Sequence, residues 1–99
     1  RKAAESEAEH RARHDGLTDL PNRLHFRERF AQQLGRVRRE GGEVALFCLD
    51  LDRFKTVNDT LGHPVGDELL RQVAERMRRL ISPADTLARL GGDEFALMQ

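Results

Sequence analysis

The chain has 99 residues, of which 17 are Lys or Arg and 17 are Asp or Glu, so its formal net charge is zero. This length suits one small α/β domain, and the balanced charge argues against a nucleic-acid-binding surface, which needs a basic excess. No stretch is apolar and long enough to span a bilayer, no signal peptide is present, and the lone Cys48 excludes an intrachain disulfide. We therefore expect a cytoplasmic domain without direct membrane contact, whether or not its parent protein is tethered to a membrane.

Residues 1–14 contain Ala, Glu, Arg, Lys and His but no large apolar residue. This composition favours a helix that has no core-facing stripe, and we interpret it as a connecting helix from an upstream sensory domain. His10 and His14 lie one turn apart, which is a suitable spacing for a shared metal ion. Two solvated histidines are the simpler interpretation, because no third ligand is in view.

The next segments are a loop, an amphipathic helix and a strand. Pro21 interrupts residues 15–22, and Asn22 is a good N-cap for a helix that continues to Gly41-Gly42. The run Val44 to Leu49 is continuously apolar and contains Cys48. It predicts a central strand that is buried on both faces.

Two helices and a β-hairpin complete the pattern. Residues 54–61 predict a short helix that Gly62 and Pro64 end, and Asp67 begins a longer helix that ends before Pro83. Residues 86–90 and 95–98 flank Gly91-Gly92 and predict the hairpin. The order of elements indicates an α+β fold with helices on an antiparallel or mixed sheet. Because the last strand reaches Gln99, we expect the domain to be incomplete.

Acidic residues follow the predicted central strand and also occupy the hairpin tip. Asp50 and Asp52 point the same way if the chain is extended there, and Asp93-Glu94 follow two glycines that let backbone approach a ligand. Each group alone is an ordinary strand end or turn. On adjacent strands, Asp50 and Asp93 would form the paired acids that metal-assisted phosphoryl transfer requires.

Polar groups between these acids add the features of a nucleotide site. The backbone of Arg53, Phe54 and Lys55 would offer N–H donors to phosphate at a helix start. Asn58 and Asp67 are able to accept or donate at a base edge. Each has a structural alternative, since Asn58 also suits a helix surface and Asp67 also suits an N-cap.

Ordered motifs across nearly the whole chain resemble the GGDEF family of diguanylate cyclases. The matching segments are Asp15 to Arg23, Asp50 to Lys55, Asn58 to His63, Gly66 to Glu68, and Arg89 with Gly91 to Phe95. The resemblance implies a palm-like, nucleotide cyclase-type sheet with flanking helices, truncated here after the hairpin. Residues 15–99 would then form a partial GGDEF domain behind the connecting helix of residues 1–14.

The resemblance also implies an activity and a set of site residues. Two domains, each loaded with GTP, would meet as a homodimer and condense two GTP into cyclic di-GMP with release of pyrophosphate. Mg²⁺ or Mn²⁺ would be held by Asp50, the Leu51 carbonyl and Asp93. Glu94 would stand with Asp93 at the reacting centre, and the division of roles between them stays open. GTP would contact Arg53, Phe54, Lys55, Asn58, Asp67, Gly91 and Gly92. Phe54, Leu70 and Phe95 would serve packing.

Two departures from the family pattern have consequences. The inhibitory product site, Arg-x-x-Asp, retains only Asp85, because Ser82 stands where the arginine would be. We expect feedback inhibition through this site to be weak or absent. The later basic residues that clamp the GTP phosphates lie beyond Gln99, so we expect the 99 residues by themselves to be inactive.

Two other functions remain as alternatives. The domain would be a non-catalytic GTP-binding module that regulates an attached cyclic di-GMP phosphodiesterase, or a purely structural dimerisation unit that binds no nucleotide. The intact acids at Asp50 and at Asp93-Glu94 favour catalysis, because a retired site has no need of them.

Overall fold

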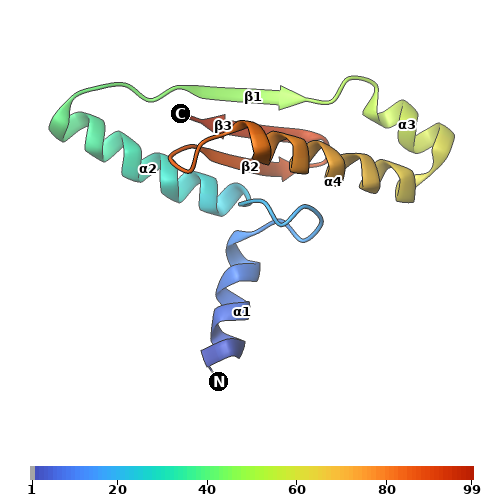
Figure 1. The fold of residues 1–99 in the computed structure, drawn as a ribbon, viewed down its shortest axis with the longest axis horizontal. Helices are drawn as coiled ribbons and strands as arrows, with labels where there is room; N and C mark the ends of the chain where they lie inside the picture. The colour runs from blue at the N-terminus through green and yellow to red at the C-terminus, as the bar shows by residue number, and fades with distance from the viewer. Residues whose placement is uncertain (1) are drawn as a thin grey trace.

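The computed structural model describes residues 2–99, with side chains from residue 7 onward. Figure 1 shows the N-terminal helix projecting from a body in which the other helices pack around a β-sheet. In chain order the elements are α1 Lys2–Arg13, α2 Arg23–Glu40, β1 Leu46–Asp50, α3 Phe54–Leu61, α4 His63–Leu80, β2 Thr86–Gly91 and β3 Glu94–Met98. The α+β class is therefore confirmed.

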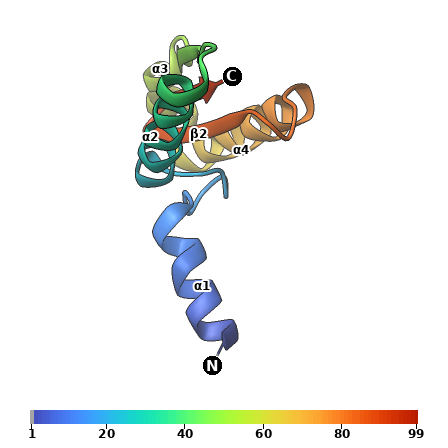
Figure 2. The ribbon, with the colours of Figure 1, turned by 90° about the vertical axis from the view of Figure 1, so that its left-hand side faces the viewer.

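Helix α1 occupies the predicted connecting segment, apart from Arg1, which lies outside the described residues. Figure 2 shows α1 extending away from the rest of the molecule. Its mean hydropathy is low and it carries no apolar stripe, so it has no face suited to packing along the body. The role of α1 as a connector to another domain stays a prediction.

Helix α2 begins and ends where its capping residues predict. The Asn22 side chain accepts a hydrogen bond from the His25 amide at 3.0 Å, which satisfies one of the open amides of the first turn. Gly41 ends the helix with a φ of 81°, a conformation that favours glycine.

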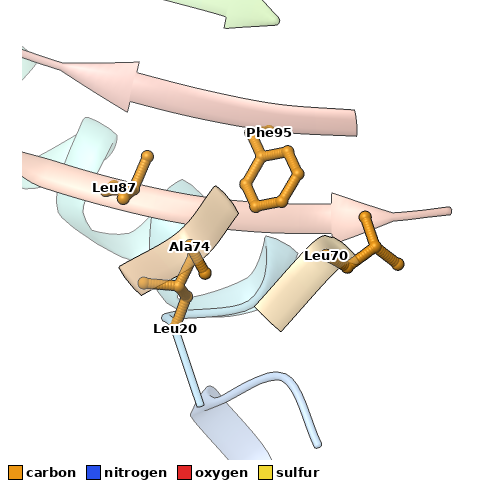
Figure 3. Close-up of a cluster of buried hydrophobic side chains, with 5 residues drawn as sticks. All are labelled: Leu20, Leu70, Ala74, Leu87 and Phe95. Atoms are coloured by element: carbon orange, nitrogen blue, oxygen red, sulfur yellow. The ribbon is translucent and has the colours of Figure 1, made fainter. Parts of the chain in front are cut away.

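The sheet has the order β1-β3-β2, and both pairings are antiparallel. Strands β2 and β3 form the predicted hairpin, with an irregular register between Arg89 and Gly91. On one face of this hairpin, Leu87 and Phe95 pack against Leu70 and Ala74 of α4, with Leu20 from the loop completing the cluster (Figure 3). The opposite face carries the buried residues Ala88, Ala96 and Met98, and α2 packs on β2 from that side.

Strand β1 corrects the prediction of a doubly buried central strand. It is an edge strand, and all five of its residues are exposed, including Cys48 and Phe47 at 47%. The apolar run does form a strand, but neither α2 nor α4 packs over it among the described residues (Figure 1). Helices α2 and α4 pack on the hairpin and bury β2 and β3, but in the described part of the chain they leave β1 uncovered.

The start of α4 is a second correction. The helix begins at His63 and not at Asp67, because Pro64 lies in its first turn and does not end the preceding helix. Proline suits that position, since its fixed φ fits a helix and its missing N–H would have no partner there. Gly62, with a φ of 90°, separates α3 from α4, and Asp67 is not an N-cap.

Among residues 2–99, no helix combines the length and the apolar character that crossing a bilayer demands.

Candidate functional site

The end of β1 and the turn between β2 and β3 lie side by side. Asp50 is the register partner of Glu94, and the Leu51 amide donates a hydrogen bond to the Asp93 carbonyl at 3.3 Å. The backbones of the two predicted acids, separated by more than forty positions in the chain, are thus joined across one sheet edge. The expected juxtaposition of Asp50 with Asp93 and Glu94 is present in the structure.

These acids are accessible and suit a hard cation. Asp50 and Glu94 are exposed, and Asp93 is half-buried. In the part of the chain that the structure describes, no three His, Cys, Asp or Glu side chains lie close enough to hold a metal ion together. A metal ion held by Asp50, Asp93 and the Leu51 carbonyl thus stays a prediction; Mg²⁺ usually takes just one or two protein carboxylates and fills its other positions with water or phosphate oxygens.

Asp52 does not belong to this set in the way we expected. Strand β1 ends at Asp50, and Asp52 lies in the following turn beside Arg53, whose φ is 61°. The alternation of side chains along a strand, which was to align Asp52 with Asp50, does not extend into a left-handed turn. The prediction that the Asp50 and Asp52 side chains point the same way was therefore wrong, because the strand ends before Asp52.

The turn itself requires glycine for conformational reasons. Gly91 has a φ of 141° and Gly92 a φ of 50°, and a Cβ added at either residue would meet nothing within 4 Å. Crowding by protein atoms therefore does not explain these glycines. Their backbone conformation does, and it leaves the surface of the turn open for a bound molecule.

An ion pair between Arg89 and Asp15, which the sequence did not predict, stabilises the Gly91-Gly92 turn. The Arg89 guanidinium donates to the Asp15 carboxylate at 2.8 Å, and it donates twice to the Gly92 carbonyl, at 3.0 and 2.8 Å. Both charged side chains are largely buried, with 13% and 16% exposed. Arg89 thus ties the loop after α1 to the glycine turn, although Asp15 and Arg89 are 74 positions apart.

Asp15 is held as a charged acceptor in this arrangement. Burial alone raises the pKa of Asp15, but hydrogen bonds from the Thr18 amide and hydroxyl and from Arg89 outweigh it and leave the pKa lowered. The turn that Asp15 makes with Thr18 was detectable from sequence, because aspartate commonly bonds to backbone two or three residues ahead. Its distant partner was not.

The start of α3 presents unpartnered backbone donors. Arg53 occupies the N-cap position, and its side chain makes no capping hydrogen bond. Phe54 packs against the edge of the core, whereas Arg53 and Lys55 are exposed. The first helical turn therefore lacks a side-chain cap, a condition that favours anion binding, and phosphate binding by this segment stays a prediction.

Asn58 of α3 packs against α4 and has a polar atom without a partner among the described residues. Its Oδ1 is buried and has no hydrogen-bond partner among the described residues. The side chain crosses directly over Gly66, where an added Cβ would lie 1.8 Å from Oδ1. Gly66 immediately precedes Asp67, so the packing of α3 on α4 brings the two predicted base-contacting residues, Asn58 and Asp67, into the same region. A buried acceptor without a partner is costly unless a ligand supplies the donor.

The segment expected to hold a degenerate inhibitory site forms a closed turn. The Asp85 carboxylate accepts a hydrogen bond from the Ser82 amide at 3.0 Å, and the Asp85 amide donates to the Ser82 carbonyl at 3.0 Å. The Asp85 side chain thus already serves its own loop, and Ser82 contributes no positive charge.

The fold and the site together define an α+β domain with an acidic strand edge beside an open glycine turn. The family model described as "Diguanylate cyclase, GGDEF domain" matches residues 12–99, and the chain belongs to this family. The three-stranded sheet and its flanking helices are thus part of the palm-like cyclase fold.

Three similar proteins illustrate the relationship. The chain is 49% identical over 87 residues to MucR of Pseudomonas aeruginosa, a bifunctional diguanylate cyclase and cyclic di-GMP phosphodiesterase, covering 88% of the chain and 13% of MucR. It is 45% identical over 89 residues to the diguanylate cyclase TpbB of the same species, covering 90% of the chain and 20% of TpbB. The crystal structure of the coiled coil and GGDEF domain of DgcB from Caulobacter crescentus, in complex with c-di-GMP, superposes with a TM-score of 0.93 at 35% identity, covering 98% of this chain and 51% of that one. The chain therefore spans a small part of these curated relatives.

Proposed function

We propose that this chain carries half of a diguanylate cyclase active site, at which two GTP molecules are condensed into cyclic di-GMP. Membership of the GGDEF family supports an enzyme of this kind. The observation that carries the proposal is the hydrogen bond between Leu51 and Asp93, because it sets the acidic end of β1 against the glycine turn. The proposal places the domain in the cytoplasm, with a sensory domain upstream of α1.

The chain offers a place for each part of one GTP. The unpaired Oδ1 of Asn58, together with Asp67, would accept from the N–H groups of guanine. The open amides at the start of α3, next to Lys55, would bind phosphate oxygens. Mg²⁺ or Mn²⁺ at Asp50, Asp93 and the Leu51 carbonyl would supply positive charge at the attacked phosphate.

The reaction needs a second copy of this site. In each of two steps, a 3′-hydroxyl of one GTP attacks the α-phosphate of the other, an O–P bond forms, and the bond to pyrophosphate breaks. The hydroxyl proton must leave, and Glu94 and Asp93 are the carboxylates at the turn able to take it. Because the acids lie on an exposed edge, two domains can face each other across their nucleotides as a homodimer.

The test is to incubate the full-length protein with GTP and Mg²⁺ and to measure cyclic di-GMP and pyrophosphate. Asp50→Asn is expected to lower the rate by about a hundredfold or more, since it removes a metal ligand at the developing charge. Asp59→Asn is the matched control, because Asp59 is an exposed acid of α3 outside the site. Equal activity of the Asp50 and Asp59 variants would refute the assignment.

A second candidate is a GTP-binding module that regulates an attached phosphodiesterase. The similarity to MucR supports this second candidate, because MucR is a bifunctional diguanylate cyclase and cyclic di-GMP phosphodiesterase. This function predicts that the full-length protein forms no cyclic di-GMP while GTP changes the rate of cyclic di-GMP hydrolysis. Asn58→Ala should then abolish the response to GTP, and Asp59→Asn should preserve it.

A further inference from the structure

Three histidines join the end of α1 to the start of α2. The rings of His10 and His14 stack with their centroids 3.6 Å apart and their planes within 5°. His25, in the first turn of α2, meets the edge of His14 at 5.5 Å. We call His10, His14 and His25 the histidine joint. The reaction proposed above uses none of them.

The other contacts at this junction involve no histidine. Arg13 makes two hydrogen bonds to the Glu28 carboxylate, at 2.9 and 3.1 Å. Asn22 donates its backbone amide to the Arg13 carbonyl and its side-chain amide to the Ala12 carbonyl, both at 2.9 Å. These contacts hold the last turn of α1. The turns before it depend on the histidine joint, since histidine is the side chain that ordinarily changes charge between about pH 5 and 8.

A first proton on the histidine joint has a partner. His10 Nε2 lies 2.6 Å from the Asp19 carboxylate, and this contact lowers the pKa of Asp19, so the acid stays charged. Arg78 of α4 also faces Asp19. A positive charge on the His10 ring is therefore neutralised by Asp19 and leaves α1 in place.

A second proton has no such partner. His14 uses Nδ1 to donate to the His10 carbonyl at 2.8 Å, and in the described side chains its ring makes no ion pair with a carboxylate. Protonated, it would stack against an already charged His10 at 3.6 Å. The Asp19 carboxylate interacts electrostatically with both rings, but it forms a hydrogen bond only with His10. Like charges at this separation repel each other, and this repulsion opposes the stacking.

His25 adds to the effect from the other side. Its Nδ1 is buried without a hydrogen-bond partner in the described part of the chain. Burial, and then the charge of His14, lowers the pKa of His25; the Arg13 backbone opposes this shift, Arg29 adds to it, and Glu28 opposes it, with a net lowering. Because the folded pKa lies below the ordinary value near 6.5, the neutral ring stabilises the joint above that pH. This contribution is lost as the pH falls below it.

We propose that the histidine joint is a pH-sensitive attachment, which holds α1 against the domain when it carries at most one proton and lets α1 pivot about Arg13 when it carries two. The pivot lies at Arg13 because its pair with Glu28 and the hydrogen bonds from Asn22 join the last turn of α1 to the start of α2 without a histidine. The loop that follows α1 contains Asp15, so the pivot also adjoins the ion pair that anchors the glycine turn.

The test is a distance measurement between spin labels on α1 and α2. Labels on Ala8→Cys and Gln32→Cys, in a Cys48→Ser chain, report the angle of α1, since all three positions are exposed. The distance distribution should be narrow at about pH 8 and broad at about pH 5. A chelator in the buffer keeps metal ions from bridging His10 and His14.

Three variants separate the histidine joint from a general effect of acid. His14→Phe keeps an aromatic ring without a titratable charge, and His14→Gln removes the charge by a different route; both should stay narrow at the lower pH. His63→Gln is the matched control, because His63 begins α4 outside the joint and should leave the broadening unchanged. A wild-type distribution that does not broaden, or His14 variants that broaden as the wild type does, would overturn the proposal.

Discussion

Replacing Arg89 by alanine tests whether the loop after α1 and the glycine turn form one unit. The substitution removes the ion pair with Asp15 and both hydrogen bonds to the Gly92 carbonyl. It leaves the strand itself intact, because Arg89 pairs with Phe95 through its backbone. Its amide also keeps its hydrogen bond to the Pro21 carbonyl at 3.0 Å.

The expected loss follows from burial of the pair. Removing one partner of a buried ion pair costs about 3–5 kcal/mol, because the other charge stays desolvated. Here the Asp15 carboxylate keeps the Leu17 amide, the Thr18 amide and the Thr18 hydroxyl as donors. The cost should therefore fall near the lower end, at about 3 kcal/mol.

Urea unfolding of the chain, read as the midpoint at constant m-value, measures this loss. Arg71→Ala is the control, since Arg71 forms an exposed pair with Glu68 and its loss should change stability by less than about 0.5 kcal/mol. In a double-mutant cycle with Asp15→Asn, the coupling to Arg89→Ala should be about 1–3 kcal/mol. If the two losses simply add, or if Arg89→Ala behaves like Arg71→Ala, the two segments are not one unit.

The pH dependence of the same difference gives an independent check. The pKa of Asp15 is lowered in the folded chain, so its charged form contributes stability above the ordinary value of 3.8. That contribution is lost as the pH falls below 3.8 and through the folded pKa. The gap between the wild type and Arg89→Ala should therefore be constant near neutrality and shrink in acid. A gap that grows in acid would contradict this reasoning.

Three further substitutions examine the cap, the helix pair and the core by the same unfolding measurement. Asn22→Ala should cost about 1–2 kcal/mol, because the side chain caps α2 and also binds the end of α1; a loss of a few tenths would exclude it as a cap. Gly66→Ala should cost about 1–3 kcal/mol, and less when Asn58→Ala removes the colliding side chain; purely additive losses would show that they do not collide. Phe95→Ala should cost about 3–5 kcal/mol, and the half-exposed Phe47→Ala about half of that or less; equal losses would mean that β1 is covered.

Local chemistry explains which elements the sequence predicted well. Asn22 and Gly41 bound α2 because capping depends on one residue and its nearest turn. The hairpin around Gly91-Gly92 depends equally on neighbouring residues. Pro64 misled the prediction of α4, since proline stands both after helices and in their first turn, and only the backbone of Gly62 decides between these roles.

Long-range partners explain what the sequence did not predict. The apolar run of β1 predicts a strand, but burial depends on which helices pack over it, and among the described residues they pack on the hairpin instead. Asp15 and Arg89 are two common residues 74 positions apart, and no spacing rule joins them. His25 meets the edge of His14 through the fold, and no spacing rule in the sequence joins these two residues.

Predicting that Asp50 lies beside the glycine turn requires less information than predicting whether β1 is buried. The turn marks one end of the hairpin, so β3 starts there and β2 ends there. A strand antiparallel to β3 has its carboxyl end at the turn, and a strand parallel to β2 would have it there too. Since β1 pairs antiparallel with β3, Asp50 reaches Glu94. The direction of β1 alone thus brings the two acidic segments together, whichever strand of the hairpin is its neighbour and however exposed its faces are.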